Sequence, residues 1–190
     1  MTSSTHPFDY LEVLEQSASL YSAPIPEAQA DLNYWQGVSF LLNSQHYMVQ
    51  IGSISEILPV PQTTPLPGVK RWVKGIANVR GRLIPIVSLG EFLHSGRSLS
   101  QGKSQNSGKP NQNNRILVIE KKDLSVGLIV DEVQGMLQFA TNSYSDEIPA
   151  SLPESVHPFT RGSYAKDQHY VVFSVESLVT NDDFLKVASE

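Results

Sequence analysis

The sequence contains no cysteine among its 190 residues. This absence excludes a disulfide framework, catalysis by a thiol, and any zinc or iron–sulfur site held by thiolates. The chain also lacks a run of the roughly 18 apolar residues needed to span a bilayer, and residues 1–9 lack the basic start and apolar run of a secretory signal. We therefore expect a cytoplasmic protein that does not insert directly into a membrane.

Charged residues are also scarce. They make up 17% of the chain, and 14 basic against 19 acidic side chains leave a net charge of -5. Such a balance does not attract a phosphate backbone over long range, so we expect no nucleic acid partner. The hydrophobic content of 40% is enough for one sizeable core, or for two smaller cores that share an interface.

Motifs for bond-making chemistry are missing as well. No nucleophile elbow of the form G-x-S-x-G occurs, and the segment Gly102-Lys103-Ser104 lacks the glycine and the preceding strand of a phosphate-binding loop. The carboxylate pair Asp182-Asp183 lies in a polar segment and is expected to be solvated, whereas Asp131 is expected to cap a strand or to accept backbone N–H groups in a turn. We therefore predict no catalytic residues, no cofactor and no enzymatic activity.

A metal site is not expected either, because no two of the histidines have the spacing that places two imidazoles on one helical face. These histidines are His6, His46, His94, His157 and His169.

Short apolar runs rich in β-branched and aromatic residues begin at Gly37, and Gly, Pro, Asn or Asp closes each of them. This texture predicts an all-β protein, an antiparallel barrel or a pair of barrels, with two short helical pieces at Ile54–Leu58 and Val175–Leu178. The predicted strands are Val38–Leu42, Tyr47–Ile51, Leu83–Leu89, Ile116–Ile119, Val126–Val130, Val133–Phe139 and Tyr170–Val175.

The chain divides into three parts by composition. Residues 1–34 are expected to form a partly ordered N-terminal extension, in which a short apolar pattern predicts either an amphipathic helix or a tail. Residues 35–179 should form the main domain, with a low-complexity, solvated loop at 94–114. Residues 180–190 are expected to be a C-terminal tail.

Two segments carry a resemblance to a known family. The segment Trp72–Leu89 contains Gly75, Asn78 and Arg80-Gly81 before an apolar strand with a proline, and Val126–Val133 contains a glycine strand followed by Asp131. Both resemble signatures of the CheW-like chemotaxis adaptor family, although Ser88 stands where that family usually has aspartate. The resemblance covers about residues 35–179. The residues from Gly75 to Gly81 and from Asp131 to Met136 are similar to those of the family branch that serves type IV pilus twitching motility.

The resemblance implies two five-stranded SH3-like or OB-like barrels side by side, with short helical turns. It also implies a non-catalytic adaptor, associated with membrane receptor arrays, that couples a chemoreceptor to a histidine kinase. The implied partners are the regulatory domain of a CheA-type kinase and the cytoplasmic tip of a methyl-accepting receptor. The implied partner-binding residues are Ile54, Glu56, Gly75, Arg80 and Gly81.

Two interpretations of the Arg80-Gly81 pair stay open at this point. The glycine either supplies backbone angles that a Cβ forbids or lets a partner approach, and we favour a docking role for the Arg80 guanidinium because it offers a planar fork of donors. An oligonucleotide-binding β-barrel is the alternative function, since small barrels often present aromatic residues to single strands. A small hydrolase is a third possibility.

Overall fold

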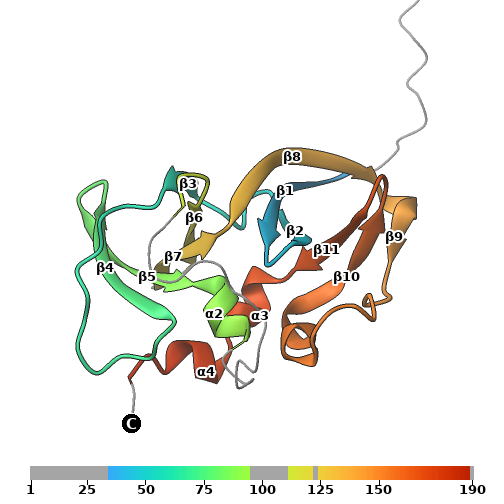
Figure 1. Ribbon diagram of the computed structural model, residues 1–190. Helices are drawn as coiled ribbons and strands as arrows, with labels where there is room; N and C mark the ends of the chain where they lie inside the picture. The colour runs from blue at the N-terminus through green and yellow to red at the C-terminus, as the bar shows by residue number, and fades with distance from the viewer. Residues whose placement is uncertain (1–33, 95–110, 122–123, 189–190) are drawn as a thin grey trace, which may run out of the picture. The chain divides into compact units, whose positions relative to one another are not determined.

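The computed structural model describes residues 34–94, 111–121 and 124–188. The described strands form two sheets with a few short helices between and below them (Figure 1). The all-β prediction is therefore confirmed. The proposed N-terminal extension lies outside the described residues except for Tyr34, which begins the first strand. Most of the low-complexity loop, residues 95–110, also lies outside them.

The six-stranded sheet combines both ends of the described chain. Its strand order is β8-β1-β2-β11-β10-β9, and its parallel pair joins β2 to β11. Its strands are β1 (Tyr34–Leu42), β2 (Gln45–Gln50), β8 (Glu132–Ala140), β9 (Tyr144–Ser145), β10 (Thr160–Ala165) and β11 (His169–Phe173).

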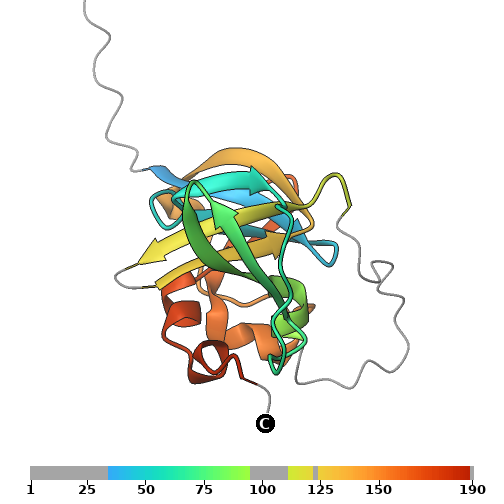
Figure 2. The same ribbon diagram turned by 90° about the vertical axis from the view of Figure 1, so that its left-hand side faces the viewer.

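The five-stranded sheet is built from the middle of the chain. Its order is β3-β6-β7-β5-β4, and its parallel pair joins β5 to β7. Figure 2 shows this sheet from its own side, with the β4–β5 hairpin in green in front. Its strands are β3 (Glu56–Pro59), β4 (Val73–Val79), β5 (Arg82–Ser88), β6 (Arg115–Lys121) and β7 (Leu124–Val130).

Both sheets are mixed, so the prediction of purely antiparallel pairing is wrong. A parallel pair needs a crossover connection, and the link from β5 to the β6–β7 hairpin supplies one through α2 (Leu89–Leu93). The described pairing leaves β8 and β9 at the edges of one sheet and β3 and β4 at the edges of the other. The pairing among the described strands therefore shows two open sheets and does not show a closed barrel.

The predicted helical piece at Ile54–Leu58 is also wrong, because this segment forms strand β3. The Ser55 N–H donates to the Val118 carbonyl at 2.8 Å, and residues Glu56 to Pro59 pair with β6. Burial alternates with a period of two along β3, as in a strand at a sheet edge. Each of the seven predicted strands overlaps an observed strand. The observed strands β3, β4, β9 and β10 were not predicted as strands.

The remaining helical elements are short. They are η1 (Thr141–Ser143), η2 (Glu154–Phe159), α3 (Val175–Val179) and α4 (Asp182–Leu185). The predicted helical piece at Val175–Leu178 is confirmed as α3, whose N-terminus is capped by the Ser174 side chain. None of the described helices is long and apolar enough to cross a membrane.

The core consists of one large cluster and two smaller ones. The large cluster takes side chains from both sheets and from α2, α3 and α4, so it joins the two halves. One small cluster, centred on Met48 and Tyr164, lies within the six-stranded sheet, and the other, centred on Ile86 and Ile116, lies within the five-stranded sheet. The C-terminal segment takes part, because the Phe184 ring stacks on Trp72 with centroids 5.8 Å apart.

Candidate functional site

The β4–β5 hairpin turns through two residues, Arg80 and Gly81, between the paired residues Val79 and Arg82. Both have positive φ, 50° and 84°, as a type I′ turn requires. The Asn78 side chain fixes this turn, because its Oδ1 accepts the Gly81 N–H at 2.8 Å. Glycine is the residue that takes such angles without a steric cost, and the sequence places it there.

The turn holds Arg80 against Glu56 of the edge strand β3. Arg80 Nε lies 3.0 Å from Glu56 Oε2, and the two side chains are 74% and 24% exposed. The Oε2 atom is itself buried and makes this ion pair without an aligned hydrogen bond. An exposed pair of this kind contributes only about 0–1 kcal/mol to stability. Its main physical effect is to orient the guanidinium of a side chain that is 74% exposed.

Gly75 has a different position. It is buried at a β-bulge with φ 131°, and a Cβ there would overlap the Thr64 carbonyl oxygen. Thr64 and Ile76 exchange backbone hydrogen bonds of 2.8 and 2.9 Å beside it. Gly75 therefore allows the proline-rich segment to cross closely over β4 and supports the hairpin from within.

The structure brings three of the five sequence-predicted residues together, namely Glu56, Arg80 and Gly81. Ile54 is half-buried and packs against the large core cluster, two residues before Glu56. Gly75 lies inside, toward the other end of β4. These two residues shape the elements that carry the pair, and neither is a fully exposed contact.

Sequence reasoning missed a second ion pair beside the first. Arg82 Nη1 lies 2.9 Å from Glu120 Oε1 of β6, and the two side chains are 69% and 43% exposed. The next residue, Leu83, is 70% exposed. A signal was available, since the period-two alternation from the buried Ile84 and Ile86 directs Leu83 to the opposite face of the sheet.

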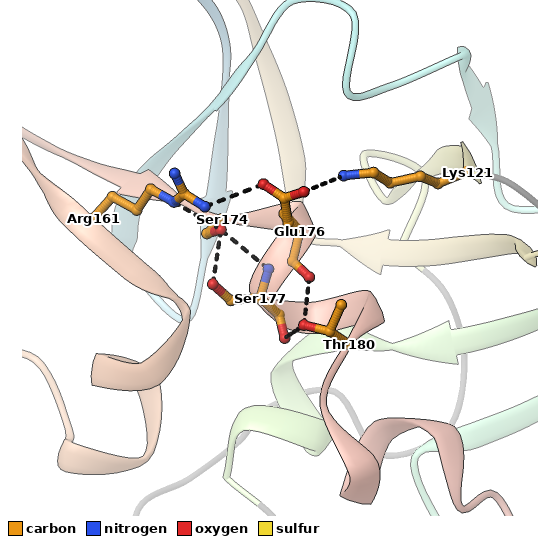
Figure 3. A network of polar contacts seen from close by, with 6 residues as sticks. All are labelled: Lys121, Arg161, Ser174, Glu176, Ser177 and Thr180. Atoms are coloured by element: carbon orange, nitrogen blue, oxygen red, sulfur yellow. Dashed lines mark hydrogen bonds and ion pairs between the residues drawn. The ribbon is translucent and has the colours of Figure 1, made fainter.

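A polar network links the two sheets near α3 (Figure 3). Glu176 accepts from Lys121 of β6 at 3.0 Å and from Arg161 of β10 at 3.3 Å. The hydrogen bond and charge of Lys121, with a smaller effect of Arg161, lower the pKa of Glu176. Ser174 Oγ accepts from Arg161 Nε at 3.1 Å, so the same arginine also contacts the cap of α3.

The prediction for Asp131 is confirmed. Its Oδ2 accepts the Asn43 N–H at 2.7 Å, and its own N–H donates to the Leu41 carbonyl at 3.1 Å. Asp131 thus ties the β1–β2 turn to the junction of β7 and β8. Among the residues with described positions, no three histidine or carboxylate side chains gather as metal ligands would.

Comparison with known proteins agrees with this arrangement. The family model described as CheW-like domain matches residues 36–183 of the sequence. The protein PilI of Pseudomonas aeruginosa is 38% identical over 182 residues, which cover 96% of each chain. The chemotaxis protein CheW of Thermotoga maritima is 31% identical over 111 residues, 58% of this chain and 66% of the relative.

A solved structure shares the fold. The crystal structure of the scaffolding protein TtCheW from Thermoanaerobacter tengcongensis has a TM-score of 0.62 at 24% identity, covering 80% of this chain and 96% of that one. The extent of the family match and the identity to PilI go beyond a shared fold. This chain belongs to the CheW family of chemosensory signalling scaffolds.

Proposed function

We propose that this protein is a non-catalytic, cytoplasmic adaptor that couples methyl-accepting chemoreceptors to the regulatory domain of a CheA-type histidine kinase. It would act in receptor arrays at the membrane and control type IV pilus twitching motility. The observation that carries the proposal is the exposed Arg80 guanidinium, which a rigid turn and Glu56 hold at the end of a CheW-type sheet.

The pilus pathway is supported by the extent of similarity. The relative named PilI matches 96% of the chain at 38% identity, whereas the Thermotoga relative named CheW matches 58% at 31%. The PilI match is therefore both longer and higher in identity than this CheW match.

The proposed mechanism is geometric. The adaptor holds kinase and receptor in a fixed relation, so that a shift at the receptor biases the kinase between two states. In this proposal Glu56, Arg80 and Gly81 meet a partner directly, and Ile54 and Gly75 keep β3 and β4 in the shape that presents them. A docking role suits a turn whose backbone is already ordered, because little conformational entropy is then lost on binding.

The test is co-purification of the full chain with the chemosensory kinase and with the cytoplasmic fragment of a receptor. We expect one complex that contains all three proteins, and kinase activity that responds to the receptor only when the adaptor is present. An adaptor that binds neither protein, at concentrations at which a CheW from the same cells binds both, would contradict the proposal.

The alternative of an oligonucleotide-binding barrel has little support. Such proteins stack bases on exposed aromatic residues in a basic groove. Among the aromatic residues that the structure describes, Tyr34 and Tyr144 are the exposed ones. Arg80, Arg82, Lys121 and Arg161 are each paired with a glutamate. A gel-shift assay at low salt with a single-stranded oligonucleotide should show no complex.

A further inference from the structure

A polar cluster lies beside the aromatic core cluster of the six-stranded sheet. It joins four elements through side-chain contacts, and its members are Ser39 of β1, His46 of β2, Gln134 of β8, Gln168 in the turn before β11, and Tyr170 of β11. The Ser39 side chain is fully buried, and Tyr170 belongs to the aromatic core cluster. The cluster is therefore separate from the β4–β5 hairpin and lies in the other sheet.

His46 is at the centre of this cluster, and its Nδ1 atom has two neighbours. Nδ1 lies 2.8 Å from Gln134 Oε1 and 3.3 Å from Gln168 Nε2. The first contact requires a hydrogen on Nδ1, because an amide oxygen only accepts. The second requires a lone pair on Nδ1, because an amide nitrogen only donates. One nitrogen atom cannot satisfy both, so the protonation state of the ring selects one of the two partners.

The other contacts of the two glutamines distinguish these states. Gln134 Oε1 also accepts from the Ser39 hydroxyl at 3.0 Å, which keeps this oxygen turned toward His46. Gln168 Nε2 also donates to the Tyr170 hydroxyl at 2.9 Å. An imidazolium ring carries hydrogen on both nitrogens, so it donates to Gln134 and cannot accept from Gln168. A neutral ring with its hydrogen on Nε2 accepts from Gln168 and sets two lone pairs opposite each other, on Nδ1 and on Gln134 Oε1.

Gln134 occupies a special position in the ladder. Ser39 pairs with Gly135 and Phe40 pairs with Val133, so Gln134 is the extra residue of a β-bulge in β8. Strand β8 forms one edge of the sheet (Figure 1). A bulged residue lacks a partner of its own in the ladder, so side-chain bonds contribute more to its position than they do elsewhere in a strand.

The groups that face the His46 ring keep a constant charge near neutral pH. Tyr170 contacts the ring edge-on with centroids 5.7 Å apart, and its hydroxyl donates to Asp167 Oδ1 at 3.3 Å. Lys166 lies in the same turn as Asp167, and Glu132 of β8 lies in the same cross-strand row as His46, with β1 between them. Carboxyl, phenol and ammonium groups ordinarily keep their charge between about pH 5 and 8, whereas histidine ordinarily changes its charge there.

We propose that His46 is a pH-dependent switch that controls the β8 bulge. The protonated ring donates from Nδ1 to Gln134 and holds the bulge against β2. The neutral ring accepts from Gln168, and the link to β8 is lost. The shape of this edge strand thereby depends on pH, and the switch requires no partner protein, so it is independent of the proposed function.

The first measurement is NMR spectroscopy of the isotope-labelled full chain between about pH 5 and 8. The nitrogen shifts of an imidazole show which ring nitrogen carries hydrogen. We expect the neutral His46 ring to carry it on Nε2, the acidic form to carry it on both nitrogens, and the Gln168 side-chain amide to shift with the same midpoint. A neutral ring with hydrogen on Nδ1 would overturn the proposal, because both forms would then bind Gln134 alike.

The second measurement is amide hydrogen exchange at residues 133–136, corrected for the intrinsic effect of pH. In the wild type we expect exchange to be about fivefold slower at the acidic end, as one added hydrogen bond predicts. His46→Asn keeps a donor near the Nδ1 position and cannot titrate, so the difference should vanish. Gln168→Leu removes the competing donor, so the neutral ring can keep its hydrogen on Nδ1 and the difference should vanish there too.

His169→Asn is the matched control. His169 is the exposed neighbour of Tyr170 and points to the opposite face of β11, so this variant should keep the wild-type difference. A pH difference that persists in His46→Asn or in Gln168→Leu would overturn the proposal, because another group would then be responsible. The NMR measurement on the wild type needs no variant, so it decides the matter even if a variant does not fold.

Discussion

The two sheets each contain a hairpin with the same kind of turn, and the two turns have different surroundings. Asn43 and Ser44 connect β1 to β2 with φ of 51° and 63°, and Arg80 and Gly81 connect β4 to β5 with φ of 50° and 84°. Asp131 and the β7–β8 junction hold the first turn against the body of the domain. The second turn presents to solvent a guanidinium whose Nε lies 3.0 Å from Glu56 Oε2.

The difference shows that turn geometry and turn function are separate properties. Both turns obey the same backbone requirement of two successive left-handed residues. Their roles depend on what the neighbouring strands bring to them, a carboxylate that accepts a backbone N–H in one case and a carboxylate that orients a side chain in the other. We therefore expect mutations at the first turn to change stability and mutations at the second to change binding.

The largest expected effect is on binding by Arg80→Glu. This change places two carboxylates together at the docking turn, and the affinity for the kinase regulatory domain should fall by roughly 2–5 kcal/mol, as for a truncated charge at an interface. Titration calorimetry measures the affinity. The unfolding free energy should change by only about 1 kcal/mol, since an exposed ion pair contributes little. Unchanged affinity of the folded variant would remove Arg80 from the site.

The next effect is on stability, at the first turn. Asp131→Ala removes the carboxylate that accepts the Asn43 N–H, and we expect a loss of about 1–3 kcal/mol of unfolding free energy. Asp131→Asn keeps one acceptor oxygen and should lose less. Urea denaturation checks both variants. Affinity for the kinase domain should stay at the wild-type value in both variants. A large loss of affinity would contradict the assignment of a purely structural role to the first turn.

A reciprocal pair of substitutions sharpens the comparison further. Ser44→Gly removes the steric cost of a side chain at a left-handed backbone position and should raise the unfolding free energy by roughly 0.5–1 kcal/mol. Gly81→Ser introduces that cost and should lower the unfolding free energy by about 1 kcal/mol. A Cβ at Gly81 meets nothing within 4 Å, so its cost is that of the backbone alone. Thermal unfolding of the two variants shows whether each substitution raises or lowers the unfolding free energy. Shifts of the same sign would mean that contacts outside the turns dominate.

The smallest effect belongs to the exposed carboxylate between the sheets. Lys121 and then Arg161 lower the pKa of Glu176 below its ordinary value of 4.5, so its charge stabilises the folded state above that value. This contribution is lost as the pH falls through the lowered pKa. The difference in melting temperature between wild type and Glu176→Gln should therefore be present at neutral pH and vanish in acid, and salt should reduce it.

Local patterns predicted much of the fold. Alternating apolar residues indicated the long strands, and the Asn-x-x-Gly spacing at Asn78 and Gly81 is typical of the tight turn that the structure contains. The prediction of a helical piece at Ile54–Leu58 was wrong because a glutamate between apolar residues is compatible with one helical turn as well as with an edge strand. Pairing with β6, far along the chain, decided in favour of the strand.

Phe184 gives a second example. Its polar neighbours predicted a tail, yet its ring packs on Trp72 and Phe92 in the large core cluster. A single aromatic residue near the end of a chain carries no periodic signal, so its burial cannot be predicted from local pattern.

The amino-acid sequence by itself determined the family, seven of the described strands and the presence of an arginine at a constrained turn, because these depend on residues that are neighbours along the chain. Only the tertiary structure decided which glutamate pairs with each arginine. Those contacts join β3 to the β4–β5 turn and β5 to β6, and the strand order of a sheet is set by long-range packing that no local spacing encodes.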